Sequence, residues 1–308
     1  MTKTAWVFPG QGSQALGMGV DLQDFPKAEP FFEKAEEILG WSILDICQSD
    51  EKTLSHTPYT QPCLYVVESI LGHLMRDRGY RPQLVAGHSL GEYVALYVAG
   101  VFTFEDGLAL VKQRSKLMNG APEGQMEALM GFQREELEQA VEQIPDVVIA
   151  NDNSPVQVVV SGTPEALEQL RGSIKIKRAV TLKVSRAFHS PFMAPAEAEY
   201  RQVLESVPFT DAQVPVLSNV NPTPEKKAEI LKERLMAQMT GSVRWRQTSL
   251  RLAEEGIEQA IEIGPGNALT GLIKRTCSGL ALKNIKTAAD LFPTLSKTET
   301  PLSASTVG

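Results

Sequence analysis

The stretch Leu84-Val85-Ala86-Gly87-His88-Ser89-Leu90-Gly91-Glu92 decides the fold, because it joins an apolar strand to a tight turn and then to a helical run. Residues 87–91 fit the pattern G-x-S-x-G, in which a serine on a strained strand-to-helix turn holds its hydroxyl clear of the backbone. The turn therefore predicts Ser89 as the nucleophile of an enzyme. The alternative is a serine that only caps the following helix.

The chain on both sides of this turn alternates between apolar strands and helical runs. An apolar strand at 6–8 comes first, helical spacing follows at 64–78, and the alternation returns near the C-terminus with a strand at 260–263. This order predicts a parallel sheet with helical crossovers. We therefore expect an α/β protein whose large domain resembles that of the α/β-hydrolases.

A second, smaller unit interrupts this pattern in the middle of the chain. Its expected order is strand, helix, strand, strand, helix, strand, which is that of a ferredoxin-like fold; the ranges are 126–132, 135–144, 147–150, 156–161, 164–170 and 179–184. We expect 1–123 and 190–292 to form the large catalytic domain and 124–189 to form an inserted ferredoxin-like subdomain. Residues 293–308, rich in Ser and Thr, are expected to form a flexible tail.

The glycine-rich loop Gly10-Gln11-Gly12-Ser13-Gln14 directly follows the first strand, so it can lie beside the serine turn. A tetrahedral oxyanion needs two N–H donors, and the N–H groups of Leu90 and Gln11 are the candidates. The rival is a dinucleotide, because Gly10, Gly12 and Ala15 fit a relaxed G-x-G-x-x-A pattern. The acidic residues that should contact a ribose lie in a helical run instead, which weakens that alternative.

Only four histidines are available as the base: His56, His73, His88 and His189. His189 lies where the small unit returns to the large domain, and it is the preferred candidate over a packing role. No carboxylate between Ser89 and His189 stands out as a third member of a triad, and no histidine follows. The group that orients the base is therefore expected to be a carbonyl.

Arg114 interrupts an apolar stripe in the helix expected at 104–118, since Leu110 and Met118 lie four residues before and after it. A buried guanidinium requires an anion, and its planar fork pairs best with a carboxylate or a phosphate. That anion is either a structural Asp or Glu or part of the substrate.

The composition excludes several function classes. The chain has 308 residues, of which 43% are hydrophobic and 22% charged, and no apolar run approaches the length of a membrane span. The first residues lack a secretion signal, so a cytoplasmic enzyme is expected. Three scattered cysteines argue against disulfides and a zinc site. The net charge of −7 disfavours nucleic acid as a partner.

A series of motifs occurs in one order from Thr4 to Arg275. They are FPGQGSQ (8–14), TQPCL (60–64), GHSLGEY (87–93), QRSKLM (113–118), NDNSPVQVVVSG (151–162), AFHSPFM (187–193), SNV (218–220), SVRW (242–245) and IEIGPGNALTGLIKR (261–275). In this respect the chain resembles the malonyl-CoA:acyl carrier protein transacylases of fatty acid synthesis. It is also similar to the acyltransferases of polyketide synthases.

The resemblance implies transfer of malonyl from malonyl-CoA to the phosphopantetheine thiol of acyl carrier protein, without a metal or other cofactor, by a monomer. It implies Ser89 as nucleophile and His189 as base. Other implied site residues are Arg114 as clamp on the malonyl carboxylate, Gln11 and Leu90 as oxyanion donors, Gln238 as the carbonyl that orients the base, and Gln61 and Asn153 near the site.

Two details qualify this resemblance. Gly124-Gln125-Met126-Glu127 departs from the family's Gly-Ala-Met-Ala-like run, whereas RAFHS (186–190) resembles malonyl-selective polyketide enzymes. Fatty acid and polyketide pathways both stay open, as do two rivals, a serine hydrolase and a non-catalytic acyl-CoA binding protein. Acidic carrier protein is expected to dock on the basic residues near His189, namely Lys175, Lys177, Arg178, Lys183 and Arg186.

Overall fold

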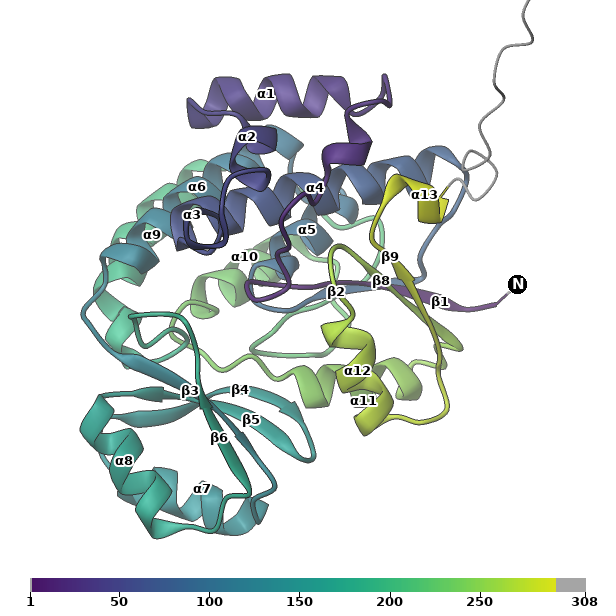
Figure 1. The fold of residues 1–308 in the computed structure, drawn as a ribbon. Coiled ribbons are helices and arrows are strands. Elements are labelled where there is room, and N and C mark those ends of the chain that lie inside the picture. The colour runs from purple at the N-terminus through teal and green to yellow at the C-terminus, as the bar shows by residue number, and fades with distance from the viewer. Residues whose placement is uncertain (1, 292–308) are drawn as a thin grey trace, which may run out of the picture.

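The computed structural model describes residues 2–291, which form a large α/β unit and a smaller unit with its own sheet (Figure 1). A five-stranded sheet lies at the centre of the large unit, and all its neighbouring strands run parallel. The order is β7 (Val216–Leu217), β2 (Leu84–Gly87), β1 (Thr4–Phe8), β8 (Gln259–Ile263) and β9 (Ala281–Ile285). The tail expected at 293–308 lies outside the described residues.

Helices cover both faces of this sheet, because successive side chains of a strand point to opposite faces. On β1, Trp6 and Phe8 pack into one buried cluster, and Ala5 and Val7 pack into another. The first cluster includes α4 (Thr57–Asp77), α5 (Gly91–Val98), α6 (Phe104–Gly120) and α9 (Ala194–Ser206); the second includes α11 (Trp245–Glu254) and α12 (Ala268–Thr276). Burial on both faces explains why these strands are apolar throughout.

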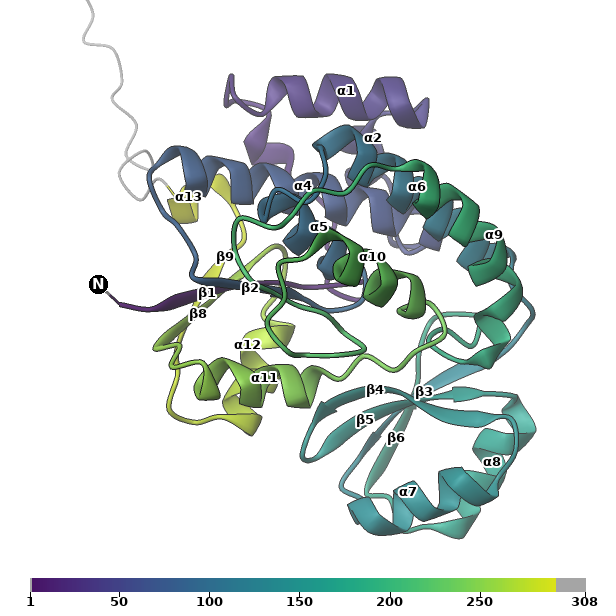
Figure 2. The ribbon, with the colours of Figure 1, turned by 180° about the vertical axis from the view of Figure 1, so that it is seen from behind.

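The remaining elements of the large unit extend the first helical layer (Figure 2). Side-chain caps define several helix starts, for example Asp50, which accepts from the N–H groups of Lys52 and Thr53. These elements are η1 (Val20–Leu22), α1 (Glu29–Leu39), α2 (Ile43–Cys47), α3 (Glu51–Leu54), η2 (Pro191–Met193), α10 (Ala228–Ala237) and α13 (Ala288–Leu291).

The small unit is an antiparallel sheet covered on one face by two helices (Figures 1 and 2). The strand order is β4-β5-β3-β6, the spatial order of a ferredoxin-like fold, which confirms the small subdomain expected from the sequence. Its elements are β3 (Gln125–Met130), α7 (Arg134–Gln143), β4 (Val147–Ser154), β5 (Gln157–Gly162), α8 (Pro164–Ser173) and β6 (Arg178–Thr181). The exact domain limits expected above stay a prediction.

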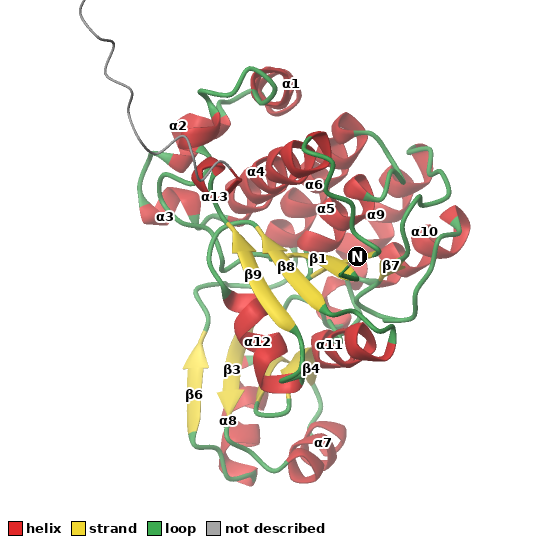
Figure 3. Cartoon of the chain, turned by 90° about the vertical axis from the view of Figure 1, so that its right-hand side faces the viewer, coloured by secondary structure: helices red, strands yellow, loops and turns green. Residues whose placement is uncertain are grey.

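Backbone contacts join the two units at two places. Glu123 and Arg186, where the chain enters and leaves the small unit, form an antiparallel bridge. On the other side, the main chain of Val243 exchanges hydrogen bonds of 2.8 and 2.9 Å with Ala150 and Asp152 of β4. Figure 3 shows α11 and α12 between the large sheet and the small unit.

Element limits differ from expectation mainly next to the cleft between the units. The sequence predicts a strand over 179–184, but β6 ends at Thr181. The Leu182 N–H still donates to Met126 O of β3 at 2.9 Å, and Leu182 to Val184 line that cleft. The helix expected from residue 64 begins at Thr57, because Pro58 in its first turn needs no N–H partner. The sequence reading also gave no account of α11 and β9.

Candidate active site

The serine turn is held in a strained conformation by close backbone packing. Ser89 has φ of 51°, a left-handed value that costs energy in a non-glycine residue. A Cβ atom on Gly87 would lie 1.9 Å from the carbonyl carbon of Gly91, and one on Gly91 would lie 2.0 Å from the carbonyl oxygen of Phe8. Only glycine therefore fits at these two positions, and the turn holds the Ser89 hydroxyl at the carboxyl end of β2.

His189 lies within hydrogen-bonding distance of that hydroxyl. Its Nε2 atom is 2.7 Å from Ser89 Oγ, and its Nδ1 atom is 2.9 Å from the main-chain oxygen of Gln238. A carbonyl only accepts, so Nδ1 carries the proton and Nε2 is free to accept from the serine. Burial and the nearby Arg114 lower the pKa of His189 to about 3, which keeps the imidazole neutral and able to act as a base.

Arg114 is fully buried, and its guanidinium group contacts the Ser89 hydroxyl. Nη2 donates to Ser89 Oγ at 3.1 Å and to Gln238 Oε1 at 2.9 Å, while Nη1 donates to Gln61 Oε1 at 2.7 Å. The Nε atom has no hydrogen-bond partner within residues 2–291, and no carboxylate there forms an ion pair with the guanidinium. The neutral amides of Gln61 and Gln238 orient this buried cation but do not neutralise its charge, so an anion can still pair with it.

The glycine-rich loop lies directly against the serine turn. A Cβ atom on Gly10 would lie 2.4 Å from the carbonyl oxygen of His88, and the His88 N–H donates to Phe8 O at 2.9 Å. The Gln11 side chain donates to Thr57 Oγ1 at 3.1 Å. This packing places the Gln11 loop against the serine turn, and Leu90, directly after Ser89, is buried. The role of their N–H groups as oxyanion donors stays a prediction.

Asn153 reaches the site from the small unit. Its Oδ1 atom lies 2.9 Å from Nε2 of His88, the residue that precedes the nucleophile. The contact with His88 is thus the observed link between β4 and the serine turn, and the structure does not bring Asn153 to Ser89 or Arg114 in the same way. Gln61, by contrast, contacts Arg114 directly and lies 3.4 Å from Gln11 Oε1.

Comparison with known proteins assigns the family. A family model described as acyl transferase domain matches residues 5–306, nearly the whole chain. The chain belongs to the acyl transferase domain family. Membership fits the fold and a reactive serine, since an acyl transferase of this geometry needs both a nucleophile and a base.

Individual relatives of this acyl transferase chain agree with one another. It is 57% identical to the malonyl CoA-acyl carrier protein transacylase of Synechocystis sp. over 94% of this chain and 99% of the relative. The crystal structure of that Synechocystis enzyme superposes with a TM-score of 0.93 over the same shares of both chains. A polyketide biosynthesis malonyl CoA-acyl carrier protein transacylase of Bacillus subtilis is 42% identical, covering 88% of this chain and 96% of that one.

A further solved structure shows a relative with its partner. It is described as a type II polyketide synthase acyl-carrier protein in complex with its malonyl-transacylase. The matched chain is 38% identical, with a TM-score of 0.90 over 94% of this chain and 98% of that one.

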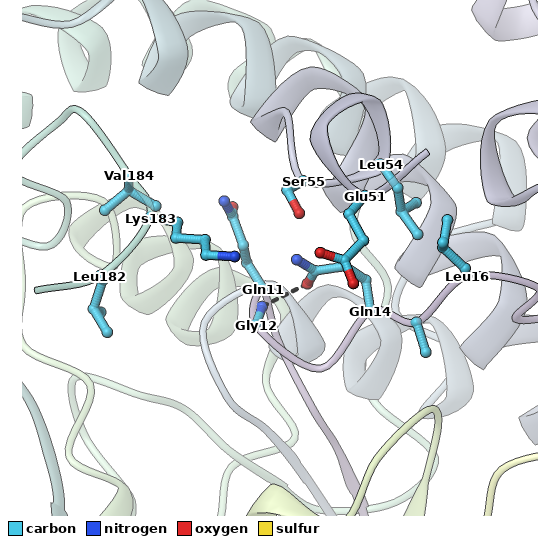
Figure 4. Close-up of a pocket in the computed structure, with 11 residues that line it drawn as sticks. Gln11, Gly12, Gln14, Leu16, Glu51, Leu54, Ser55, Leu182, Lys183 and Val184 are labelled. Atoms are coloured by element: carbon cyan, nitrogen blue, oxygen red, sulfur yellow. Dashed lines mark hydrogen bonds between the residues drawn. The ribbon is translucent and has the colours of Figure 1, made fainter. Parts of the chain in front are cut away.

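Two hollows flank the Gln11–Gly12 segment of this acyl transferase and share Leu182 as a lining residue. The first, of about 440 Å³, lies between the loop, α3 and Leu182 to Val184, and Figure 4 shows Lys183 extending toward Gln11 inside it. The second, of about 360 Å³, is lined by His88 and Asn153 and bordered by Arg275. The second hollow therefore leads to the turn that carries Ser89.

The departure at Gln125–Glu127 falls largely outside the acyl site. Glu127 is buried on β3 and pairs with Arg171 of α8, so it points toward the helices of the small unit. Met126 belongs instead to the main buried cluster, and Ala128 lines the second hollow. Glu127 is thus part of the interior of the small subdomain.

The expected docking residues lie in different surroundings. Lys183 lines the first hollow, whereas three others line a separate hollow around Gly131 and Phe132; they are Lys175, Lys177 and Arg178. Arg186 is half-buried, and its Nε atom donates to Asn119 O at 3.0 Å. Lys183 thus shares a hollow with Gln11 and Gly12.

The described residues contain neither a metal-binding cluster nor a membrane-spanning helix. Within residues 2–291, no group of three or more His, Cys, Asp or Glu side chains is arranged to hold a metal ion. No helix in that same part of the chain combines the length and apolarity of a membrane span. The three cysteines, Cys47, Cys63 and Cys277, are free.

Two polar residues of the site were missed by the sequence reading. Asn219 accepts from the Ser89 N–H at 2.7 Å and donates to Gly87 O at 2.6 Å, so it clamps the serine turn. Glu92 contacts both Asn219 and Gln238. Both lie in quoted motifs, SNV and GHSLGEY. The available local signal was Glu92, an acidic residue directly before the apolar run 93–96.

Proposed function

We propose that this chain transfers a malonyl group from malonyl-CoA to the phosphopantetheine thiol of an acyl carrier protein, by way of a malonyl ester on Ser89, in fatty acid or polyketide biosynthesis. One observation carries the proposal: Ser89 Oγ lies 2.7 Å from His189 Nε2 and 3.1 Å from Nη2 of Arg114, a buried arginine that has no ion pair among residues 2–291. The names of the relatives support the same acyl group and the same acceptor.

The first half of the cycle forms the acyl-enzyme. His189 Nε2 takes the proton of Ser89 as Oγ attacks the thioester carbon, and the carbonyl oxygen becomes an oxyanion. The N–H groups of Leu90 and Gln11 stabilise that charge. The intermediate then collapses, the carbon–sulfur bond breaks, and His189 returns the proton to the departing CoA thiolate.

Arg114 selects the acyl group in this scheme. The malonyl carboxylate takes the place of the missing counter-ion and pairs with the guanidinium, whose orientation is fixed by Gln61 and Gln238. A monocarboxylic acyl group leaves the buried cation unpaired. The site therefore favours a diacid thioester over acetyl-CoA.

The second half reverses the first with a different thiol. The phosphopantetheine thiol gives its proton to His189 and attacks the malonyl ester, and Ser89 leaves as the alkoxide and recovers the proton from His189. The hollow lined by His88 and Asn153 is the route for both thioester arms, because it borders the nucleophile turn. Arg275 at its edge supplies a cation for their phosphates.

The proposal also covers the oligomeric state of the enzyme and its location in the cell. We infer that the enzyme acts as a monomer, because both reacting groups and Arg114 come from one chain; light scattering at assay concentration tests this. A cytoplasmic location, expected from the sequence, stays a prediction, and fractionation of the source cells tests it.

The proposal is tested by following the products of malonyl-CoA with holo-acyl carrier protein. Malonyl-carrier protein should form in stoichiometric balance with free CoA, and Ser89→Ala should abolish it. Rapid release of free malonate without carrier protein would favour the serine hydrolase instead. Binding of malonyl-CoA without any product would favour the non-catalytic binding protein.

A further inference from the structure

Glu92 is a buried carboxylate that the mechanism above does not use. It lies in the first turn of α5, three residues after the nucleophile, and its side chain is fully shielded from solvent. Its Oε2 atom accepts from Gln238 Nε2 at 2.8 Å and from the N–H of Asn219 at 3.1 Å. A buried acid is costly, so its two contacts indicate what it does.

Both partners of Glu92 hold reacting groups. Asn219 clamps the backbone of Ser89, as described above. Gln238 holds the base through its main-chain oxygen, and its side-chain Nε2 also donates to Ser89 O at 2.9 Å. One carboxylate oxygen of Glu92 is thus hydrogen-bonded to both Asn219, which holds the nucleophile, and Gln238, which holds the base.

The same network reaches the guanidinium. The Gln238 amide donates to Glu92 through Nε2 and accepts from Arg114 through Oε1, at 2.8 and 2.9 Å. A negative group on one side and a positive group on the other leave only one orientation of this amide satisfied. Charge-assisted bonds of this kind are about twice as strong as neutral ones.

We propose that Glu92 is a positioning residue for malonyl transfer: its carboxylate locks the Gln238 amide and the Asn219 clamp, and so sets the distances among Ser89, His189 and Arg114. This inference rests on the proposed function, because it assigns Glu92 a part in that reaction.

The charge state of Glu92 gives this role a pH signature. Burial raises the pKa of Glu92 to about 7, although Gln238, Asn219, Ser218 and Arg114 act in the opposite direction. Two neighbouring groups titrate outside this range: the pKa of Tyr93 is raised to about 12 and that of His189 is lowered to about 3. On α4, which also packs against α5, Glu68 faces Gly264 instead.

The carboxylate is therefore present above pH 7 and lost below it. Glu92→Gln keeps the shape but removes the charge at every pH. We expect the rate of Ser89 acylation at pH 8 to fall about 10- to 100-fold in Glu92→Gln, with KM for malonyl-CoA changed far less. At pH 6 the wild type should lose most of its advantage, so the ratio of the two rates should shrink.

Stopped-flow release of CoA from pH 5.5 to 9 measures this ratio, with Glu68→Gln as the matched control. Glu68 is equally buried but lies outside the network, and its variant should behave as wild type. A ratio that is constant with pH, or an unchanged acylation rate, would overturn the inference. Product formation by wild type and its loss in Ser89→Ala would still support the proposed function, so the two failures are distinguishable. Thermal unfolding of each variant checks that the fold is intact.

Discussion

At the residue scale, Arg114 separates this site from an ordinary serine esterase. An esterase has no use for a fully buried guanidinium whose partners are two neutral amides and the nucleophile. Such a cation would be destabilising without compensation, and the stacking of its guanidinium 5.3 Å from the centre of the Tyr93 ring offsets only part of the cost. The unpaired charge is thus best explained by a substrate that brings its own carboxylate.

Replacing Arg114 should therefore change selectivity more than basic reactivity. In Arg114→Ala, kcat/KM for malonyl-CoA should fall at least about 100-fold, the effect of losing a charged pair worth several kcal/mol. The value for acetyl-CoA should stay level or rise. Separate assays with the two thioesters measure the ratio, and equal loss for both substrates would mean that Arg114 supports the fold instead of the substrate.

Sequence reasoning reached the residues of the site whose chemistry is visible locally. Ser89 lies in a turn motif, and Arg114 interrupts an apolar stripe. Glu92 and Asn219 were not predicted, because their partners lie far away along the chain. Glu92 contacts Gln238, 146 residues away, and Asn219 contacts Ser89, 130 residues away. Only the folded chain shows that they act on the same atoms.

At the scale of elements, β6 and the segments directly before and after it carry the basic residues expected to meet a carrier protein. β6 is an edge strand of the small sheet. Its N-terminal end borders one hollow, and Lys183, just beyond its C-terminal end, lines the other hollow beside Gln11. An acidic partner whose arm must reach Ser89 should use the end near the cleft.

Charge reversal tests this placement. We expect Lys183→Glu to raise KM for carrier protein about 3- to 10-fold, the size of one lost charge pair at an interface rim, and to leave acylation by malonyl-CoA unchanged. Lys283→Glu, on the edge strand β9 of the large sheet, is the matched control and should change neither step. Equal loss in both half-reactions would place Lys183 in the active site and not at a docking surface.

The elements themselves were largely predictable, since strands buried on both faces are apolar and the small unit follows a known order. Their ends were not. β6 ends at Thr181, just before the residues 182–184 that line the cleft, and β3 ends just before Gly131, which has a positive φ. The first of these ends lies against the Gln11 loop and α3 of the large unit, whereas Gly131 packs against Lys177 of its own unit. Both ends therefore depend on residues far away in the sequence.

At the scale of the whole molecule, the cleft between two units brings distant segments to one point. The nucleophile follows a central strand of the large sheet, the base lies where the small unit ends, and Arg114 comes from a helix between them. The sequence predicted both units and the insertion of one into the other. The pairing of β4 with Val243, which fixes one unit on the other, left no recognisable pattern.

The most direct test of this arrangement is the location of the acyl group after mixing the protein with malonyl-CoA alone. Peptide mapping by mass spectrometry should find one malonyl ester, on Ser89, which disappears when holo-carrier protein is added. Failure to form an adduct, or an adduct on any other residue, would contradict the account.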